Sequence, residues 1–235
     1  MNESITFIPF SRLLIIFIPV GLLIFILHSW YLDWKNSLYA IFRMLIQLMI
    51  IGYFLTYIFL SDNVFIILTI LISMVLIASW IALGSVSEDR SISIKYAFIS
   101  IMIGGGLTLL LVTQFVLKLD PWYMPRYMIP IAGMIFASSM NGVSLAAERL
   151  KAELERNINH DKAKVIALRA SLIPITNSLF AVGLVSLPGM MTGQILSGIS
   201  PHVAVRYQIM VMCMIFSAAG LSSYLFLRMF KPNKD

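Results

Sequence analysis

The chain has 235 residues, of which 60% are hydrophobic and only 12% are charged, against roughly 25% charged in soluble domains. This composition excludes a soluble catalytic domain and predicts an integral membrane protein, with one transmembrane domain over residues 1–235 in contact with the lipid bilayer. The net charge of +6 would suit a nucleic-acid-binding protein. In a membrane protein, however, the positions of Lys and Arg carry the information, and we expect no nucleic-acid partner.

Apolar segments of about 20 residues, the length that a bilayer requires, recur along the whole chain. In chain order they cover residues 7–27, 38–60, 64–83, 96–117, 128–147, 171–197 and 203–227. The sequence therefore predicts an all-α polytopic bundle of about seven transmembrane helices. The sixth segment is longer than one perpendicular crossing needs, so we expect it to tilt or break.

Two polar residues share one face of the second apolar segment. Arg43 and Gln47 are four residues apart, which places them one above the other on a helix. A charge inside the bilayer is costly, so this face is expected to point into the bundle or to its edge. Arg43 is close to the start of its helix, and both snorkelling to the membrane surface and a functional role stay open for it.

The only substantial hydrophilic segment separates the fifth and sixth apolar segments and covers residues 148–169. Leu154 and Ile158 fall at helical spacing, so the fifth helix is expected to continue out of the membrane. A turn follows, where Asn159 or Asp161 can cap a second helix that returns to the bilayer. The segment is thus predicted to be a cytoplasmic helical hairpin, with a solvated loop without a partner as the alternative.

Residues 183–201 read GLVSLPGMMTGQILSGISP and contain four Gly and two Pro within an apolar run. Pro188 has no backbone N–H to donate, so the sixth helix is expected to kink or break near Leu187. Irregular backbone at membrane depth persists only inside protein or beside a wet cavity. The alternative is close helix packing at small residues, here Gly189, Gly193 and Gly198.

The distribution of Lys and Arg predicts the orientation of the chain. With seven spans and an extracytoplasmic N-terminus, most of the basic residues, including those of the hairpin and the C-terminal tail, fall on the cytoplasmic side, as the positive-inside rule requires. We therefore expect a multi-pass protein of the cell inner (plasma) membrane whose C-terminus is cytoplasmic.

Sequence motifs of catalysis and nucleotide binding do not occur in the chain. There is no GxxxxGK[ST], HExxH, CxxC or GxSxG pattern, so we expect neither an enzyme nor a bound cofactor, and any ATP hydrolysis is expected in a separate subunit. The three His residues are isolated in sequence, which leaves any metal site unassigned.

Methionines recur in the second half of the chain. Soft thioethers suit soft ions such as Cu(I) and serve equally as adaptable packing. Three methionines at alternating positions on one helix do not all share one face, which favours packing. The methionines in question are Met134, Met140, Met190, Met191, Met210, Met212 and Met214.

Four stretches of the chain resemble a known family of transporters. They are RMLIQLMIIGYFL at 43–55, IPIAGMI at 129–135, GLVSLPGMMTG at 183–193 and YQIMV at 207–211. They resemble the FetB-like ATP-binding-cassette permeases, a family implicated in bacterial iron export and similar to plant permeases linked to aluminium tolerance. The resemblance covers most of the chain in order, from the second apolar segment onward.

This resemblance implies a permease subunit that exports a metal ion such as iron and works with a separate ATP-binding-cassette ATPase, as two permeases with two ATPase subunits. The hairpin is then the candidate docking element, through Leu154, Ile158, Asp161 and Lys164. The candidate residues of the translocation path are Arg43, Gln47, Asn177, Leu187, Pro188, Gly189, Met190, Met191 and Thr192.

The chain departs from the family pattern at several places. The segment 148–169 is shorter than in the family, Asn177 and Phe180 stand where an Asp and a Lys are usual, and Ser138 replaces an Asn. These departures leave two alternatives: a non-transporting paralogue that acts as a scaffold or assembly partner, and a permease for a non-metal substrate. Ion-coupled secondary transport ranks last, because no acidic residue lies well inside the predicted spans.

Overall fold

The computed structural model describes residues 8–61, 63–84 and 90–230. These residues form helices and connecting segments without a β-strand, which confirms the predicted all-α fold. The chain divides into two compact units, Met1–Ser61 and Asp62–Asp235, and each is described by itself.

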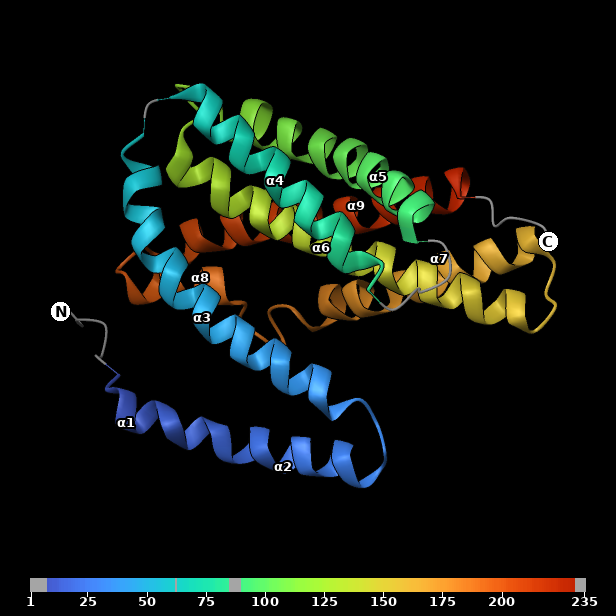
Figure 1. Cartoon of the computed structure of the whole chain (residues 1–235). Helices are drawn as coiled ribbons and strands as arrows, with labels where there is room; N and C mark the ends of the chain where they lie inside the picture. Colours follow the sequence, from blue (N-terminus) through green and yellow to red (C-terminus); the bar gives the residue numbers. More distant parts are fainter. Residues whose placement is uncertain (1–7, 62, 85–89, 231–235) are drawn as a thin grey trace. The chain divides into compact units, whose positions relative to one another are not determined.

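The first unit consists of two long apolar helical segments (Figure 1). Its elements are α1 (Phe10–Leu13), the 3₁₀-helix η1 (Leu14–Ile16), α2 (Phe17–Ser29) and α3 (Trp34–Phe59). The carboxylate of Asp33 accepts a hydrogen bond from the backbone N–H of Asn36 at 3.1 Å, so it caps the first turn of α3. None of the residues in these helices is buried, as expected for helices whose apolar surface faces lipid.

The second unit is a bundle of longer helices. Its elements are α4 (Val64–Ala82), α5 (Arg90–Leu110), the π-helix η2 (Leu111–Val116), α6 (Pro125–Glu155), α7 (His160–Ala181), α8 (Gly189–Leu196) and α9 (Pro201–Met229). Across the described parts of both units, six helices are long and apolar enough to cross a membrane. The predicted sixth span, 171–197, is not one helix, because it is divided between α7, an irregular segment and α8.

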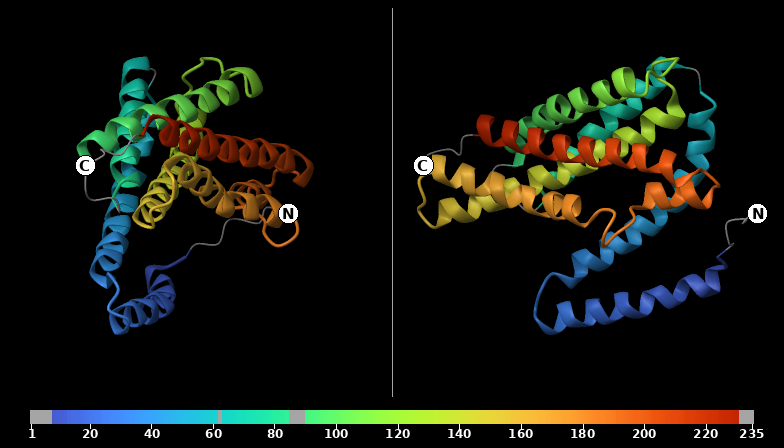
Figure 2. Two further views of the ribbon diagram at one scale, coloured as in Figure 1. Left: turned by 90° about the vertical axis from the view of Figure 1, so that its right-hand side faces the viewer. Right: turned by 180° about the vertical axis from the view of Figure 1, so that it is seen from behind.

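Helix α9 is the centre of the second unit and packs against α5, α6 and α7; Figure 2 shows it running between α5 and α7 in its right-hand view. The approach is close because glycines stand at the crossings. A Cβ atom added to Gly104 of α5 would lie 2.6 Å from the Oγ of Ser222, and one added to Gly142 of α6 would lie 2.7 Å from the Oγ of Ser223. Small residues therefore set the spacing of these three helices.

Hydroxyl groups at the same crossing bond to one another. Ser222 of α9 donates a hydrogen bond to the Oγ of Ser139 at 3.0 Å, and Ser139 donates to the carbonyl oxygen of Ala218 at 3.2 Å. Both serines are fully buried. Their mutual bonding ties α6 to α9, since a buried hydroxyl without a partner would cost stability.

The predicted helical hairpin is confirmed. Helix α6 continues through residues 148–155, and Asn159 caps α7 by accepting a hydrogen bond from the N–H of Asp161 at 3.0 Å. The two helices bury Leu150, Ala163 and Ala167 in the core.

A buried carboxylate also stabilises the end of α6. Glu153 is only 4% exposed, and its Oε1 lies 2.6 Å from a guanidinium nitrogen of Arg149 and 3.5 Å from one of Arg156. A buried charge requires such partners, because an unpaired one is strongly destabilising.

The glycine crossing can be tested with a matched pair on α5. Gly104→Ala is expected to lower the free energy of unfolding by about 1 to 3 kcal/mol, because the new methyl group overpacks the contact with Ser222. Gly106→Ala is the control, since a Cβ there meets no atom within 4 Å. Denaturant unfolding of the detergent-solubilised protein, followed by circular dichroism, measures both, and equal stability of the two variants would contradict the assignment.

Candidate functional site

The sixth predicted span contains a short irregular segment between α7 and α8. Helix α7 ends at Ala181 and α8 begins at Gly189, so the predicted break is confirmed and starts several residues before Leu187. The carbonyl oxygen of Ala181 accepts hydrogen bonds from the N–H groups of Leu184, Val185 and Ser186 at 2.8 to 3.2 Å. The chain thus turns tightly on the last residue of α7 rather than continuing the helix.

Two residues of the predicted motif fix the start of α8. Pro188 is its N-cap, with φ −63° and ψ 151°, a conformation outside the helical region that the proline ring readily adopts. Thr192 donates its backbone N–H to the Pro188 carbonyl at 3.0 Å and its hydroxyl to the Leu187 carbonyl at 3.2 Å. The Leu-Pro-Gly sequence therefore restarts a helix after the break.

Within the described part of the chain, no helix packs closely against the three glycines of the alternative interpretation. A Cβ added to Gly189, Gly193 or Gly198 would meet no atom within 4 Å, unlike the glycines at the α9 crossings. Gly183 and Gly198 have φ values of +82° and +86°, a region that L side chains rarely adopt. These two glycines are required by turns at the two ends of the α8 region.

Apolar side chains of the break extend away from the rest of the second unit. Leu184 is 89% exposed, Val185 is 85% exposed, and Phe180 and Leu187 are also exposed. The second unit alone therefore leaves this segment uncovered, although irregular backbone inside a bilayer needs protein or a wet cavity around it.

A pocket lies beside the start of α8, between α6 and α9. We call it the thioether pocket, because three methionines from three helices line it, and its volume is about 330 Å³. Its lining residues are Arg126, Tyr127, Pro130, Ile131 and Met134 of α6, Met190 of α8, and Tyr207 and Met210 of α9.

The predicted path residues do not all meet at this pocket. Met190 lines it, and the neighbouring residues from Leu187 to Thr192 belong to the same turn and first helical turn of α8. Asn177 is exposed on the last part of α7. Arg43 and Gln47 are exposed on α3 and belong to the first unit.

The predicted docking residues of the hairpin divide into two kinds. Leu154 and Ile158 pack against the core, so they hold the hairpin together. Asp161 is exposed and Lys164 is half-buried. The structure adds Val165, an apolar side chain that is 70% exposed on the same turn of α7.

Sequence reasoning missed five residues of the thioether pocket, namely Arg126, Tyr127, Pro130, Ile131 and Tyr207. Arg126 and Tyr127 precede an apolar span and read as membrane-interface residues, whereas Tyr207 lies in the YQIMV stretch that carried only a resemblance. Their convergence depends on how the first turns of α6 and α9 pack around α8, which no pattern within a single helix reports.

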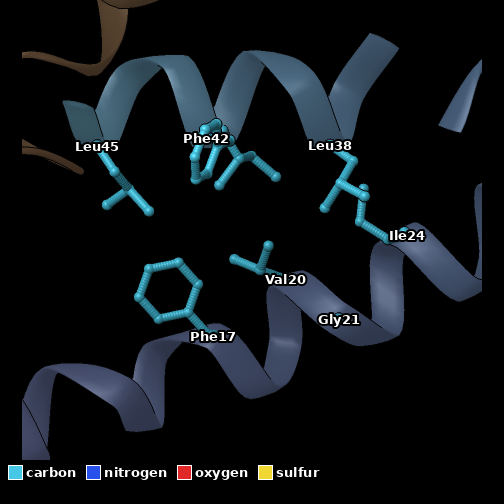
Figure 3. Close-up of a pocket in the computed structure, with 8 residues that line it drawn as sticks. Phe17, Val20, Gly21, Ile24, Leu38, Phe42 and Leu45 are labelled. Atoms are coloured by element: carbon cyan, nitrogen blue, oxygen red, sulfur yellow. The ribbon is translucent and has the colours of Figure 1, made fainter. Parts of the chain in front are cut away.

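The first unit has a groove of a different kind, with a volume of about 290 Å³ between α2 and α3. Figure 3 shows Phe17 and Val20 of α2 facing Phe42 and Leu45 of α3, with Gly21 leaving space between them. All the lining residues are apolar, so this groove offers no polar group for chemistry.

Comparison with known proteins identifies related membrane proteins. Residues 10–233 match the model of the family described as "Uncharacterised protein family (UPF0014)". The probable iron export permease protein FetB of Escherichia coli is 37% identical over 208 residues, which cover 80% of this chain and 77% of the relative. A UPF0014 membrane protein of Synechocystis is 36% identical over 196 residues, 77% of this chain and 76% of the relative.

A plant relative covers slightly more of the sequence. The protein ALUMINUM SENSITIVE 3 of Arabidopsis thaliana is 32% identical over 227 residues, which are 87% of this chain and 82% of the relative. No solved structure matches the chain.

The turn after α7 can be tested with a second matched pair. Gly183→Ala is expected to destabilise the protein by about 1 to 2 kcal/mol, because a left-handed backbone brings the new Cβ close to a carbonyl oxygen. Gly189→Ala serves as the control, because its Cβ enters open space. Midpoints of chemical denaturation in detergent compare the two, and a loss of stability confined to Gly189→Ala would show that the turn is assigned wrongly.

Proposed function

The chain belongs to the UPF0014 family, and from this we propose that it is the permease subunit of an ATP-binding-cassette transporter that exports a metal ion such as iron. A separate ATPase subunit supplies the energy. The observation that carries the proposal is the broken α7–α8 crossing, which lies within the region matched by the family model. Broken helices with irregular backbone between them are characteristic of substrate paths in transporters.

Helix α7 connects the two regions that such a subunit needs. It runs without interruption through 22 residues from the hairpin turn at His160 to the break at Ala181, a length of about 33 Å at the helical rise of 1.5 Å per residue. A displacement of the hairpin can therefore reach the break along one continuous helix. Pro174 inside α7 is accommodated without ending the helix.

The outer surface of the hairpin is suited to contact a partner protein. Asp161, Lys162, Val165 and Arg169 are exposed on α7, and the ion pairs around Glu153 hold the preceding end of α6 in place. An exposed apolar side chain among charges is typical of a protein interface. We assign this face to the ATPase subunit.

The assembly and orientation follow from the same proposal. Two copies of the chain are expected to join two ATPase subunits, and the second copy is expected to cover the exposed apolar residues of the break. The basic hairpin is placed in the cytoplasm of a cell with the chain in its plasma membrane, with the N-terminus outside and the C-terminus inside.

The coupling between hairpin and ATPase gives the central test. Co-purified with its ATP-binding subunit in lipid nanodiscs, the chain is expected to stimulate ATP hydrolysis. In inside-out membrane vesicles that contain both subunits, the complex is expected to drive ATP-dependent uptake of radioactive iron. Val165→Arg should abolish the stimulation, because it places a charge in the apolar centre of the contact. Val165→Thr, which keeps the shape, is the control and should retain most of it.

The outcomes separate the alternatives. Stimulation that survives Val165→Arg, with unchanged thermal stability of both variants, would assign docking to another surface. Failure of the unmodified chain to stimulate its co-purified ATPase would favour the scaffold function over the exporter. Stimulation without iron uptake would point to a permease for a different substrate.

The orientation is tested by a reporter at the C-terminus. A fusion of green fluorescent protein after Asp235 is expected to fluoresce and a fusion of alkaline phosphatase to be inactive, because the first folds only inside the cell and the second only outside. Reporters placed after Lys118 provide the control and should give the opposite pair of signals. Active phosphatase at the C-terminus would reverse the proposed topology.

A further inference from the structure

The thioether pocket brings together side chains that lie far apart in the sequence. Met134, Met190 and Met210 come from α6, α8 and α9, and all three are half-buried. Fully buried methionines would only fill the core, and fully exposed ones would face lipid. These three pack in part against the core and also border a cavity of about 330 Å³, so part of each side chain is accessible to a guest.

The chemistry of the lining selects the guest. Thioether sulfur is a neutral, soft ligand that prefers Cu(I) and similar ions, whereas Mg²⁺, Ca²⁺ and Mn²⁺ require oxygen ligands. The pocket lining contains no carboxylate, imidazole or thiol. Among the described residues of the whole chain, no three His, Cys, Asp or Glu side chains gather to hold a metal.

The remaining polar residues of the pocket also favour an ion of low charge. The guanidinium of Arg126 stands at the same lining, and its repulsion of a divalent ion is twice its repulsion of a monovalent one at equal distance. Arg126 is exposed at the first turn of α6, so its long side chain can turn away toward the membrane surface. Tyr127 and Tyr207 also line the pocket, and the face of an aromatic ring attracts cations.

The location of the pocket relates it to the break. Its lining residues fall within the first ten residues of α6, α8 and α9, and α6 and α9 begin at the end of the second unit away from the α6–α7 hairpin (Figure 1). Met190 is the second residue of α8, so any shift of the restart at Pro188 moves one of the three sulfur ligands relative to the other two. A change in the conformation of the break would therefore strengthen or weaken the coordination of a bound ion.

We propose that the thioether pocket binds a soft monovalent metal ion, Cu(I) or its analogue Ag(I), through Met134, Met190 and Met210. The inference rests on the proposed function, since it assigns a metal-binding site to the proposed exporter, and this site is suited to a softer ion than the iron of the transport test. It adds a site on the side opposite the hairpin, where an exported ion would leave the protein.

Silver binding to the purified full-length chain tests the proposal. Ag(I) is stable in air and is titrated against the protein in nanodiscs by equilibrium dialysis, with bound silver measured by mass spectrometry. The background is Cys213→Ser, because the exposed thiol of Cys213 would bind silver itself. The test variant carries Met134→Leu, Met190→Leu and Met210→Leu, substitutions that keep the apolar volume.

A control variant carries Met140→Leu on α6 and Met212→Leu on α9. The test variant is expected to lose at least about tenfold in silver affinity, the lower end of what even outer partners contribute to a metal site, whereas the control keeps the affinity of the background. Equal affinity in the two variants, or equal binding of Fe(II) and Ag(I) by the background, would overturn the proposal.

A spectroscopic measurement covers the case in which the test variant does not fold. X-ray absorption of the silver-loaded background protein is expected to show sulfur as the ligand shell, and a shell of oxygen or nitrogen would refute the thioether site. Neither measurement needs the ATPase. Absence of silver binding by the background protein therefore counts against the soft-metal site alone, and absence of ATPase stimulation counts against the proposed exporter.

Discussion

The close approach of α9 to α5 and α6 is the constraint on which the second unit depends. At Gly104 and Gly142 there is no room for even one additional methyl group, and the hydroxyls of Ser139 and Ser222 bond across the same crossing. In a bilayer the hydrophobic effect does not draw helices together, because lipid is as apolar as their side chains. Dispersion contacts between closely spaced backbones and a few buried hydrogen bonds must do so instead.

The segment between α7 and α8 is packed much less closely than this centre. The segment between α7 and α8 has glycines with open space beside them and apolar side chains that nothing in the second unit covers. Helix α9 links the close crossing to the break between α7 and α8, because it contacts α5, α6, α7 and α8. A change at the break can therefore proceed while the position of α9 against α5 and α6 is kept.

Much of the architecture was predictable from local sequence. Apolar length located the helices, and Asn159 identified the start of α7 because an N-cap acts within its own turn. Pro188 identified the break because proline has no backbone N–H to donate, and in the structure it marks the start of α8. Each of these signals is contained within a few neighbouring residues.

The site could be predicted only in part, because it depends on contacts between distant segments. Gly104 and Gly189 are both glycines in apolar runs, yet one lies against Ser222 and the other meets open space, a difference that a single sequence does not encode. Likewise, the methionines of the thioether pocket were judged along one helix at a time. Met210, Met212 and Met214 do not all share one face of α9. Met210 nevertheless shares a cavity with Met134 and Met190 from other helices.

Long apolar segments of the second unit lack charged side chains, and this determines how a membrane potential would act on them during a transport cycle. No Asp, Glu, Lys, Arg or His occurs in residues 64–82, 96–117, 127–147, 170–201 or 207–227. Moving one elementary charge through a potential of 100 mV involves about 2.3 kcal/mol, but rearranging these segments moves no charged side chain. Within these segments, the resting voltage of the cell would then act on a charged cargo and not on the side chains that surround it.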